Sequence, residues 1–299
     1  MPSKRTHDPV ESLRGLGAER PHRPEREGDT GAETFTILTP VLNGLPWLPE
    51  CVASVDAQRA GGLTVEHIVM DAGSTDGSRD WLRAHANASA LIFEPDRGQT
   101  DGLIRGFAQA RGRVFGWLNA DDVLEPDALS RVARALANAP SAVGVSGSAL
   151  TIDEDGRVVG AIATPPDGTL AGLLASPSNL AQPSTFFRAD AYRAVGGLDG
   201  RVDLAMDVAL WLRLARLGPF HLLSNEVLSR FRVHAGARSV RAAARTARED
   251  LKVRRQAGMP LLSPAGIALL RYAFVQPLVA PAWRRLSAQI RSLVNGAPP

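Results

Sequence analysis

The sequence predicts an α/β fold in which helices cover both faces of an open, mostly parallel sheet. The main observation is that short apolar runs alternate with segments of helical periodicity between residues 34 and 122. Composition agrees, because a chain of 299 residues that is 44% hydrophobic and 22% charged can bury a sizeable core. The same composition excludes a disordered chain, a collagen-like fibre and a disulfide-stapled module.

The predicted strands of the first half are four short apolar runs, each closed by a turn-rich loop. They are expected at residues 35–38, 67–70, 91–93 and 114–118. Helices are expected between them, because apolar residues recur at helical spacing from 48 to 55, near 79–86 and from 103 to 110. Cys51 lies on one of these apolar faces, so we expect it to be a small buried residue.

The second half is less regular. Strands are expected at 143–152, 158–163 and 184–187, and a helix at 208–217 with Asp207 as its N-cap. We expect Trp211 in that helix to be a core residue. Beyond Arg241 comes a helical, arginine-rich segment, followed by an apolar stretch. Its apolar runs stay below 18 residues, which argues against a spanning helix.

Charge balance and apolar periodicity divide the chain into three predicted parts. Residues 1–32 read as a disordered leader, 33–240 as the main domain, and 241–299 as a basic, amphipathic helical extension. The extension holds ten Lys and Arg against two Asp and Glu, whereas the whole chain has a net charge of +3. The main domain is therefore mildly acidic, which is not typical of a nucleic-acid binder.

The extension is expected to contact an anionic membrane surface, and the alternative is that its leucines pack back on the main domain. A single cysteine and an N-terminus without an apolar segment favour a reducing compartment. We therefore expect a cytoplasmic protein with peripheral contact at the inner face of the cell membrane.

Candidate functional residues follow the predicted strands, because ligands bind at the carboxyl ends of such sheets. Asp121 and Asp122 end a buried strand, and adjacent carboxylates repel each other unless a cation lies beside them. Such oxygen ligands suit Mg²⁺ or Mn²⁺, which completes its shell with substrate phosphates. The alternative is that Asp122 caps a helix starting near Glu125. Neither a GxGxxG fingerprint nor a P-loop occurs.

Several motifs in order resemble the family 2 glycosyltransferases. The donor half of that family resembles residues 36–43, 71–78, 94–99 and 118–122, and the acceptor half resembles 182–187, 195–199, 206–212 and 232–234. The matching order covers roughly residues 34–240. The resemblance implies the GT-A fold, a Rossmann-like mixed sheet flanked by helices.

The resemblance also implies roles for individual residues. It implies a catalytic base at Asp207. It implies contacts to a divalent cation, Mn²⁺ or Mg²⁺, from Asp122 and His234. It implies donor contacts from a larger set, in which Asp121 would contact the ribose: Pro40, Leu42, Asn43, Asp71, Gln99 and Asp121. Without the resemblance, Asp207 would more simply cap its helix, and His234 would be an ordinary loop residue.

The function implied by the resemblance is inverting, metal-dependent glycosyl transfer. The donor would be a nucleotide-diphosphate sugar, first of all a UDP-sugar, and the acceptor a hydroxyl of a glycan or lipid-linked molecule in cell-surface polysaccharide synthesis. One alternative is a sugar-nucleotide-binding protein without catalysis, because Leu42, Ile104 and Ala209 depart from the family pattern. A second is a nucleotidyltransferase, against which residues 39–49 lack any Lys or Arg for a triphosphate.

Overall fold

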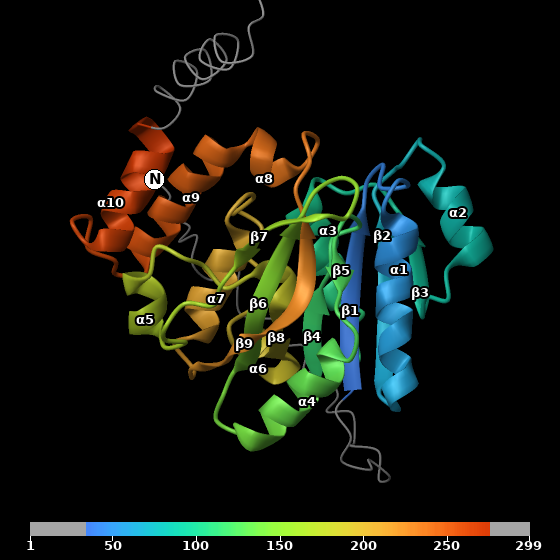
Figure 1. The fold of residues 1–299 in the computed structure, drawn as a ribbon, viewed down its shortest axis with the longest axis horizontal. Helices are drawn as coiled ribbons and strands as arrows, with labels where there is room; N and C mark the ends of the chain where they lie inside the picture. The colour runs from blue at the N-terminus through green and yellow to red at the C-terminus, as the bar shows by residue number, and fades with distance from the viewer. Residues whose placement is uncertain (1–33, 276–299) are drawn as a thin grey trace, which may run out of the picture. The chain divides into compact units, whose positions relative to one another are not determined.

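The computed structural model describes residues 34–275, and the first half of this range builds the parallel part of the sheet (Figure 1). Its strands lie in the order β3-β2-β1-β4 and its helices connect them. The bounds are β1 (Thr34–Val41), α1 (Leu48–Ala57), η2 (Gln58–Gly61), β2 (Thr64–Asp71), α2 (Ser78–His85), β3 (Ala90–Phe93), α3 (Gln99–Phe107) and β4 (Val114–Trp117). The expected strands and helices of this half are confirmed. The predicted leader at 1–32 lies outside the described residues.

The second half extends the same sheet with strands of both directions. The order continues β8-β6-β9-β5, and β7 pairs with β6. Because β8 is antiparallel to both β4 and β6, β6 and its parallel neighbour β9 run in the direction of β1 and β4. These strands are β5 (Val123–Leu124), β6 (Gly144–Ile152), β7 (Val158–Ile162), β8 (Thr185–Arg188) and β9 (Phe220–Arg232). The sheet is therefore mixed, as the resemblance implied.

The two faces of the sheet carry separate apolar cores. Side chains alternate between the faces of a strand, so Phe35 and Ile37 of β1 pack with α1 and α4, while Leu38 packs with α3 and α7. Trp211 on α7 is 2% exposed and stacks on Trp117, which confirms it as a core residue. The helices of the second half are α4 (Ala128–Asn138), α5 (Leu170–Ala175), η3 (Gln182–Ser184), α6 (Ala189–Ala194), α7 (Met206–Leu214), α8 (Arg238–Arg241), α9 (Ala243–Gln256), α10 (Pro264–Leu270) and the π-helical η4 (Arg271–Val275).

Two expected helix caps were wrong. The helix α7 begins at Met206 with Ala205 at its N-cap, so Asp207 lies inside the first turn. The helix α4 begins at Ala128 after Asp127, so Asp122 does not cap it. The helix α7 begins two residues earlier than expected, whereas α4 begins about three residues later. The long strand β9 was not predicted, because its polar residues interrupt the apolar alternation.

The described part of the C-terminal extension packs against the main domain. The helix α9 contacts α7, and α10 contacts α5 and α9. Arg254 of α9 is buried, pairs with Asp250 at 2.7 Å and donates to the carbonyl oxygens of Leu173 and Ser176. The packing alternative therefore holds for this stretch, and residues 276–299 lie outside the described range.

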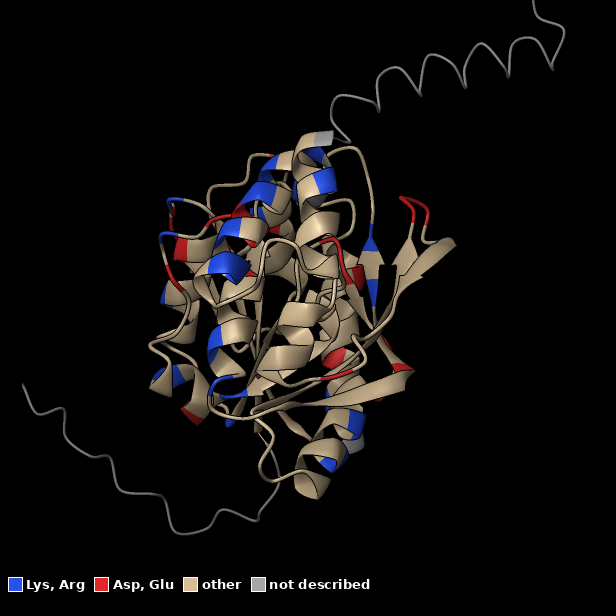
Figure 2. Cartoon of the chain, turned by 90° about the vertical axis from the view of Figure 1, so that its left-hand side faces the viewer, with Lys and Arg blue, Asp and Glu red and all other residues tan. Residues whose placement is uncertain are grey.

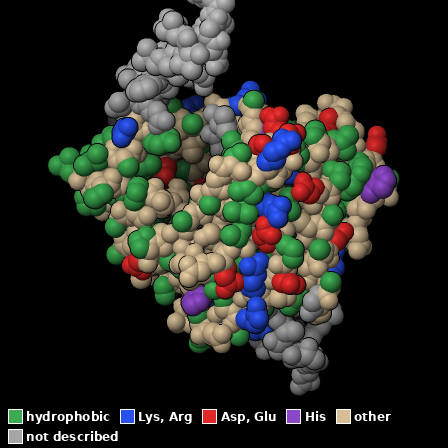
Figure 3. Space-filling view, in the orientation of Figure 1, with side chains coloured by type: hydrophobic (Ala, Val, Ile, Leu, Met, Phe, Trp, Pro, Cys, Tyr) green, Lys and Arg blue, Asp and Glu red, His purple; other side chains and the backbone are tan. Residues whose placement is uncertain are grey.

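The surface over α9 and α10 is both basic and apolar. Figure 2, which turns this side to the viewer, shows Lys and Arg following one another along the helices. Figure 3 shows hydrophobic side chains gathered at the same end of the molecule. Large apolar side chains exposed here are Leu262, Ile267, Tyr272 and Phe274, with Leu262 at 84%. Within residues 34–275, no helix has the length and apolar character needed to cross a membrane.

Candidate active site

The loops that carry the predicted site residues meet at one edge of the sheet. The strands β1, β2 and β4 are parallel and end at Val41, Asp71 and Trp117. The strand β9 runs in the same direction and ends at Arg232. Because carboxyl ends of strands with one direction share an edge, the segments 42–47, 72–77, 118–122 and 233–237 lie together, at the upper edge in Figure 1.

The first two of these loops are joined by hydrogen bonds. The Asn43 N–H donates to Ser74 Oγ at 2.8 Å, and the Thr75 N–H donates to Asn43 Oδ1 at 2.8 Å. Asn43 has a φ of 55°, in the left-handed region that asparagine tolerates better than most residues. Asn43 thus links the end of β1 to the loop after β2, and its amide is occupied in doing so.

Pro40 lies within the sheet, whereas Leu42 is exposed in the loop that follows β1. Pro40 lies inside β1, opposite Met70 of β2, and beyond the last residue pair that β1 forms with β4. Its missing N–H therefore removes no bond from the sheet. Leu42 is 63% exposed at the mouth of the loop. An exposed apolar side chain at this edge is available to contact a ligand.

Asp71 is a buried carboxylate with one engaged and one free oxygen. Its Oδ1 accepts from the backbone N–H groups of Gly73 and Ser74, each at 3.0 Å, and from Arg79 Nε at 2.6 Å. Burial raises the pKa of Asp71, but the hydrogen bonds from Ser74, Arg79 and Gly73 outweigh it and leave the pKa below its usual value. Its Oδ2 is buried and has no hydrogen-bond partner in residues 34–275. An unpaired buried acceptor is costly, and the Asp71 side chain has no exposed surface.

Asp121 and His234 form a partly exposed polar pair at this edge. His234 Nε2 lies 3.0 Å from Asp121 Oδ2, and the Asp121 side chain is 27% exposed. The imidazole packs on the Trp47 ring with centroids 4.2 Å apart. An open cleft of about 490 Å³ adjoins His234 and is lined by residues 153–155 and 233–235. This pair can offer oxygen and nitrogen ligands to a cation at the surface.

Asp122, by contrast, has no exposed surface. Its Oδ1 accepts from the Arg232 backbone N–H at 2.9 Å, and its Oδ2 accepts from Asn119 Nδ2 at 3.2 Å. Burial raises its pKa well above the usual value, and the neighbouring Asp121 charge raises it further. The structure therefore brings His234 to Asp121, whereas Asp122 ties its loop to β9.

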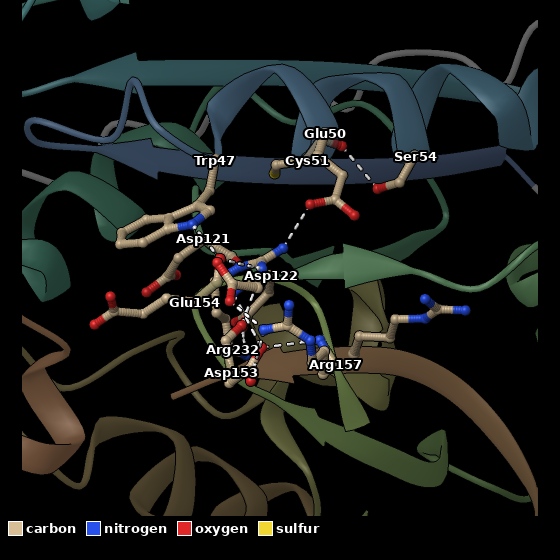
Figure 4. A network of polar contacts seen from close by, with 12 residues as sticks. Trp47, Glu50, Cys51, Ser54, Asp121, Asp122, Asp153, Glu154, Arg157 and Arg232 are labelled. Atoms are coloured by element: carbon tan, nitrogen blue, oxygen red, sulfur yellow. Dashed lines mark hydrogen bonds and ion pairs between the residues drawn. The ribbon is translucent and has the colours of Figure 1, made fainter. Parts of the chain in front are cut away.

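Arg232 is a buried arginine that joins three parts of the site (Figure 4). Its Nε donates to the Asp121 carbonyl at 2.9 Å, and its Nη2 pairs with Glu50 of α1 at 2.5 Å. Its Nη1 donates to the carbonyl oxygens of Asp153 and Glu154, at 3.1 and 3.3 Å. A buried charge is tolerated when such partners satisfy it. Arg232 thus fixes the Asp121 loop against α1 and the β6–β7 turn.

Asn119 joins the loop 118–122 to both halves of the domain. Its Oδ1 accepts from Gln99 Nε2 at 2.7 Å, and its Nδ2 donates to Gln182 Oε1 at 3.1 Å. Gln182 in turn donates to the Trp117 carbonyl at 2.6 Å. The predicted donor residue Gln99 therefore lies beside the Asp121 loop.

Asp207 lies in the first turn of α7, close in sequence to a segment that contacts the N-terminus of α3. The segment before it contacts α3, because Thr100 Oγ1 donates to the Val202 carbonyl at 3.1 Å. Arg238 bridges the two elements, pairing with Asp203 at 2.6 Å and donating to Gln99 at 3.2 Å. Burial raises the pKa of Asp207 to about 6, although the Val208 N–H bonded to its Oδ1 acts in the opposite direction. A carboxyl with this pKa is suited to take a proton near neutral pH.

The residues present fit a divalent cation shared with a ligand. No cluster of three His, Cys, Asp or Glu with metal-binding geometry occurs among the described residues, so a closed protein cage is absent there. Mg²⁺ is commonly held by one or two carboxylates together with substrate phosphates, and imidazole nitrogen is a ligand mainly of transition metals other than Mn²⁺. Asp121 supplies one such carboxylate, and His234 lies beside it.

Sequence reasoning missed four members of the site. Gln182, Arg232 and Asn119 stand inside motifs that resemble the family but were given no role. No sequence pattern pointed to Trp47, which only precedes an apolar helix. Its Nε1 donates to the Glu154 carbonyl at 3.2 Å, so it links α1 to the same turn as Arg232.

Comparison with known proteins adds independent information. The family model "Glycosyl transferase family 2" matches residues 36–179. An "Uncharacterized glycosyltransferase" of Mycobacterium tuberculosis is 30% identical over 190 residues, which is 62% of this chain and 70% of that protein. A "PGL/p-HBAD biosynthesis glycosyltransferase" of Mycobacterium bovis is 37% identical over 107 residues, covering 34% of this chain and 41% of that protein.

Solved structures share the fold at low sequence identity. The mannosyltransferase PcManGT from Pyrobaculum calidifontis, in complex with GDP-Man and Mn²⁺, has a TM-score of 0.59 and 21% identity, covering 89% of this chain and 80% of that one. TarS 1–349 of S. aureus, in complex with UDP-GlcNAc, has a TM-score of 0.56 and 15% identity, covering 83% and 73%. The chain spans 42% of the longer TarS chain. The fold, the ordered motifs and the relatives agree, and this chain is a glycosyltransferase that belongs to glycosyl transferase family 2.

Proposed function

We propose that this chain transfers a sugar from a nucleotide-diphosphate sugar to an acceptor hydroxyl, with inversion at the anomeric carbon and with Mn²⁺ or Mg²⁺ bound. The observation that carries the proposal is Asp207, a carboxyl whose pKa burial raises to about 6, in the first turn of α7. Arg238 and Gln99 link the segment before that helix to Asn119, which lies in the same loop as Asp121. A general base removes the proton of the acceptor hydroxyl, and a cation stabilises the leaving diphosphate, so these two groups would serve a direct displacement.

The donor base would bind at Asp71. Its Oδ2 can accept one N–H, whereas its Oδ1 already accepts three. Uracil offers a single imide N–H to such an acceptor, but guanine offers two neighbouring donors that would need both oxygens. This difference supports a UDP-sugar. Pro40, Leu42 and Asn43 would form the remaining wall of the base site.

The diphosphate would lie near Asp121 and His234. We propose these two as the protein contacts of the cation, because both reach the surface and lie together. The earlier expectation that Asp122 contacts the cation stays a prediction, and its complete burial counts against it. A bound cation neutralises the charge that develops on the leaving nucleoside diphosphate. Gln99, next to Asn119, would contact the donor from the α3 side.

Asp207 would remove the proton from the acceptor hydroxyl as that oxygen attacks the anomeric carbon. The C–O bond to the diphosphate breaks in the same step, so no covalent sugar–enzyme intermediate forms and the configuration inverts. The acceptor would be a glycan or a lipid-linked molecule of cell-surface polysaccharide synthesis. The relative named for PGL/p-HBAD biosynthesis supports a glycoconjugate acceptor.

The test is a donor screen with the purified full chain and Mn²⁺. UDP-, GDP- and dTDP-sugars are incubated with lipid-linked and free glycan acceptors, and nucleotide release is measured. We expect release with UDP-sugars, an inverted product by NMR, and loss of turnover in Asp207→Asn. Saturable donor binding without turnover would support a binding protein instead. Neither binding nor release with any donor would contradict the proposal.

We also propose that α9 and α10 rest on an anionic membrane surface. The protein would then be cytoplasmic and would bind the inner face of the cell membrane. The exposed cations of α9 recur three and four residues apart, on one face of the helix: Arg245, Arg248, Lys252 and Arg255. The two acids of α9 turn inward, Asp250 to Arg254 and Glu249 to the segment before α7. The outward face of the helix is therefore basic throughout.

The apolar residues of α10 and η4 adjoin this basic face. The Arg248 guanidinium lies 5.3 Å from the centroid of the exposed Phe274 ring. Exposed apolar side chains beside a row of cations suit a surface of acyl chains and anionic headgroups, where each cation contributes about 1 kcal/mol. A lipid-linked acceptor would be reached by the same contact.

The membrane proposal is tested by vesicle sedimentation of the full chain. Binding to phosphatidylglycerol-containing vesicles is expected, with loss at high salt and little binding to phosphatidylcholine alone. The double variant Arg248→Glu with Lys252→Glu should lower binding about tenfold or more. The matched control, Arg134→Glu with Arg216→Glu, alters two exposed arginines elsewhere and changes net charge equally. Equal loss in both double variants, or no binding at all, would contradict a defined docking face.

A further inference from the structure

Glu249 of α9 binds the backbone segment that leads into the proposed catalytic helix. Its Oε2 accepts from the N–H groups of Leu204 at 2.5 Å and Ala205 at 2.8 Å, and its Oε1 accepts from the Asp203 N–H at 3.3 Å. Ala205 is the N-cap of α7, and Asp207 follows two residues later. One carboxylate therefore holds three successive backbone donors directly before the proposed base.

This contact fixes the backbone immediately before the helix and not the first N–H groups of the helix itself. The N-cap residue Ala205 makes no side-chain cap hydrogen bond. Glu249 supplies an acceptor to the N–H groups of residues 203–205, and it lies 44 residues beyond Ala205 in the chain. A carboxylate at a helix N-terminus is also favoured by the helix dipole. The start of α7 is thus fixed by a helix outside the donor-binding half.

The same segment also contacts α3, directly and through Arg238 of α8. Arg238 pairs with Asp203 and donates to Gln99, and Thr100 donates to the Val202 carbonyl. The segment 202–205 therefore lies between α3 and α9, with contacts to both. Within α9, Asp250 raises the pKa of Asp207 and Arg254 lowers it, so that helix also contributes to the electrostatics of the carboxyl.

We propose that Glu249 is a positioning residue for glycosyl transfer: by fixing the backbone of 203–205, it sets where the Asp207 carboxylate meets the acceptor hydroxyl. This inference rests on the proposed role of Asp207 as the base. A base displaced by about 1 Å from the proton it must remove can lose about 10²-fold in rate. Donor binding, which uses other residues, should not depend on the contact.

The test is a kinetic comparison of full-length variants with a soluble acceptor. Glu249→Ala should lower kcat about 10- to 100-fold, while the donor KM and the Mn²⁺ affinity stay within about twofold of the unaltered protein. Glu249→Gln keeps one acceptor oxygen and should restore most of the loss. Gln256→Ala, at an exposed position of the same helix, is the matched control and should leave kcat unchanged.

The outcomes separate this inference from the proposed function. If Asp207→Asn abolishes turnover and Glu249→Ala is folded with unchanged kcat, the positioning role is wrong and the proposed function stands. If Asp207→Asn retains turnover, the proposed function itself is wrong. If Glu249→Ala does not fold, the kcat values of Glu249→Gln and Glu249→Asp test the positioning role instead. Of these, Glu249→Asp, one methylene shorter, should lower kcat more than Glu249→Gln, and equal full activity of both would overturn the inference.

Discussion

His234 Nε2 lies 3.0 Å from Asp121 Oδ2, although 113 residues separate them in the chain. The contact exists because β9 runs parallel to β6 and in the direction of β4, so that its carboxyl end reaches the edge where the loop after β4 lies. Trp47 of the first loop packs on the other side of the imidazole. One surface pair thus combines three segments of the sheet edge.

Asp121 and Asp122 should differ sharply when each is changed to asparagine. Asp121→Asn should weaken Mn²⁺ binding in the presence of UDP by about tenfold or more and leave folding intact, because its side chain is partly exposed. Asp122→Asn should mainly lower thermal stability, since both oxygens are engaged within the protein. Calorimetric titration and thermal unfolding measure the two effects. A folded Asp122→Asn without Mn²⁺ affinity would support the original expectation for Asp122.

The pH dependence of kcat should show an acidic limb. Burial raises the pKa of Asp207 to about 6, and a base acts only when deprotonated. Turnover should therefore be close to maximal above pH 7 and fall about tenfold per unit below the pKa. The measurement is kcat at saturating donor and acceptor between pH 4.5 and 8 in about half-unit steps. A profile that stays flat through pH 5 would exclude Asp207 as the base.

Asp71→Asn should weaken donor binding more than it affects the chemical step. The change removes the ion pair with Arg79 and alters the free acceptor oxygen. A hydrogen bond involving a charged group contributes about 1.5–3 kcal/mol, so UDP affinity should fall about 10- to 100-fold. Asp80→Asn, at an exposed position of the following helix, is the control. Equal UDP affinity of the Asp71 variant and the control would contradict the assignment.

Arg232→Met should destabilise the fold by about 3 kcal/mol or more, because it leaves buried carbonyl acceptors without a donor. The control is Arg230→Met on the same strand, where a partly exposed pair with Glu125 should contribute only about 0–1 kcal/mol. Urea denaturation followed by circular dichroism gives both values. A smaller loss in Arg232→Met than in Arg230→Met would show that the buried network adds no stability.

The sequence predicted the parallel half of the fold well because that half is encoded locally. Each strand and helix of residues 34–117 has its own apolar period and its own closing turn, and parallel strands joined by helices have few arrangements. The edge at which Asp71 and the Asp121 loop meet follows from this topology. Asp207 could be placed only through the family resemblance, since its local pattern indicates no more than a helix start.

The tertiary structure alone decided which members of the site lie together. Asp121 and Asp122 are neighbours with the same chemistry, and their positions differ because of where β9 lies. Asp121 is at the surface beside His234, whereas Asp122 is buried and accepts a hydrogen bond from the Arg232 N–H. The burial of Arg232 and the hold of Glu249 on the start of α7 likewise join residues far apart in the chain. Local sequence fixes a strand or a helix through its own periodicity. The partner of a side chain depends on strand order and packing between distant segments, which no local pattern encodes.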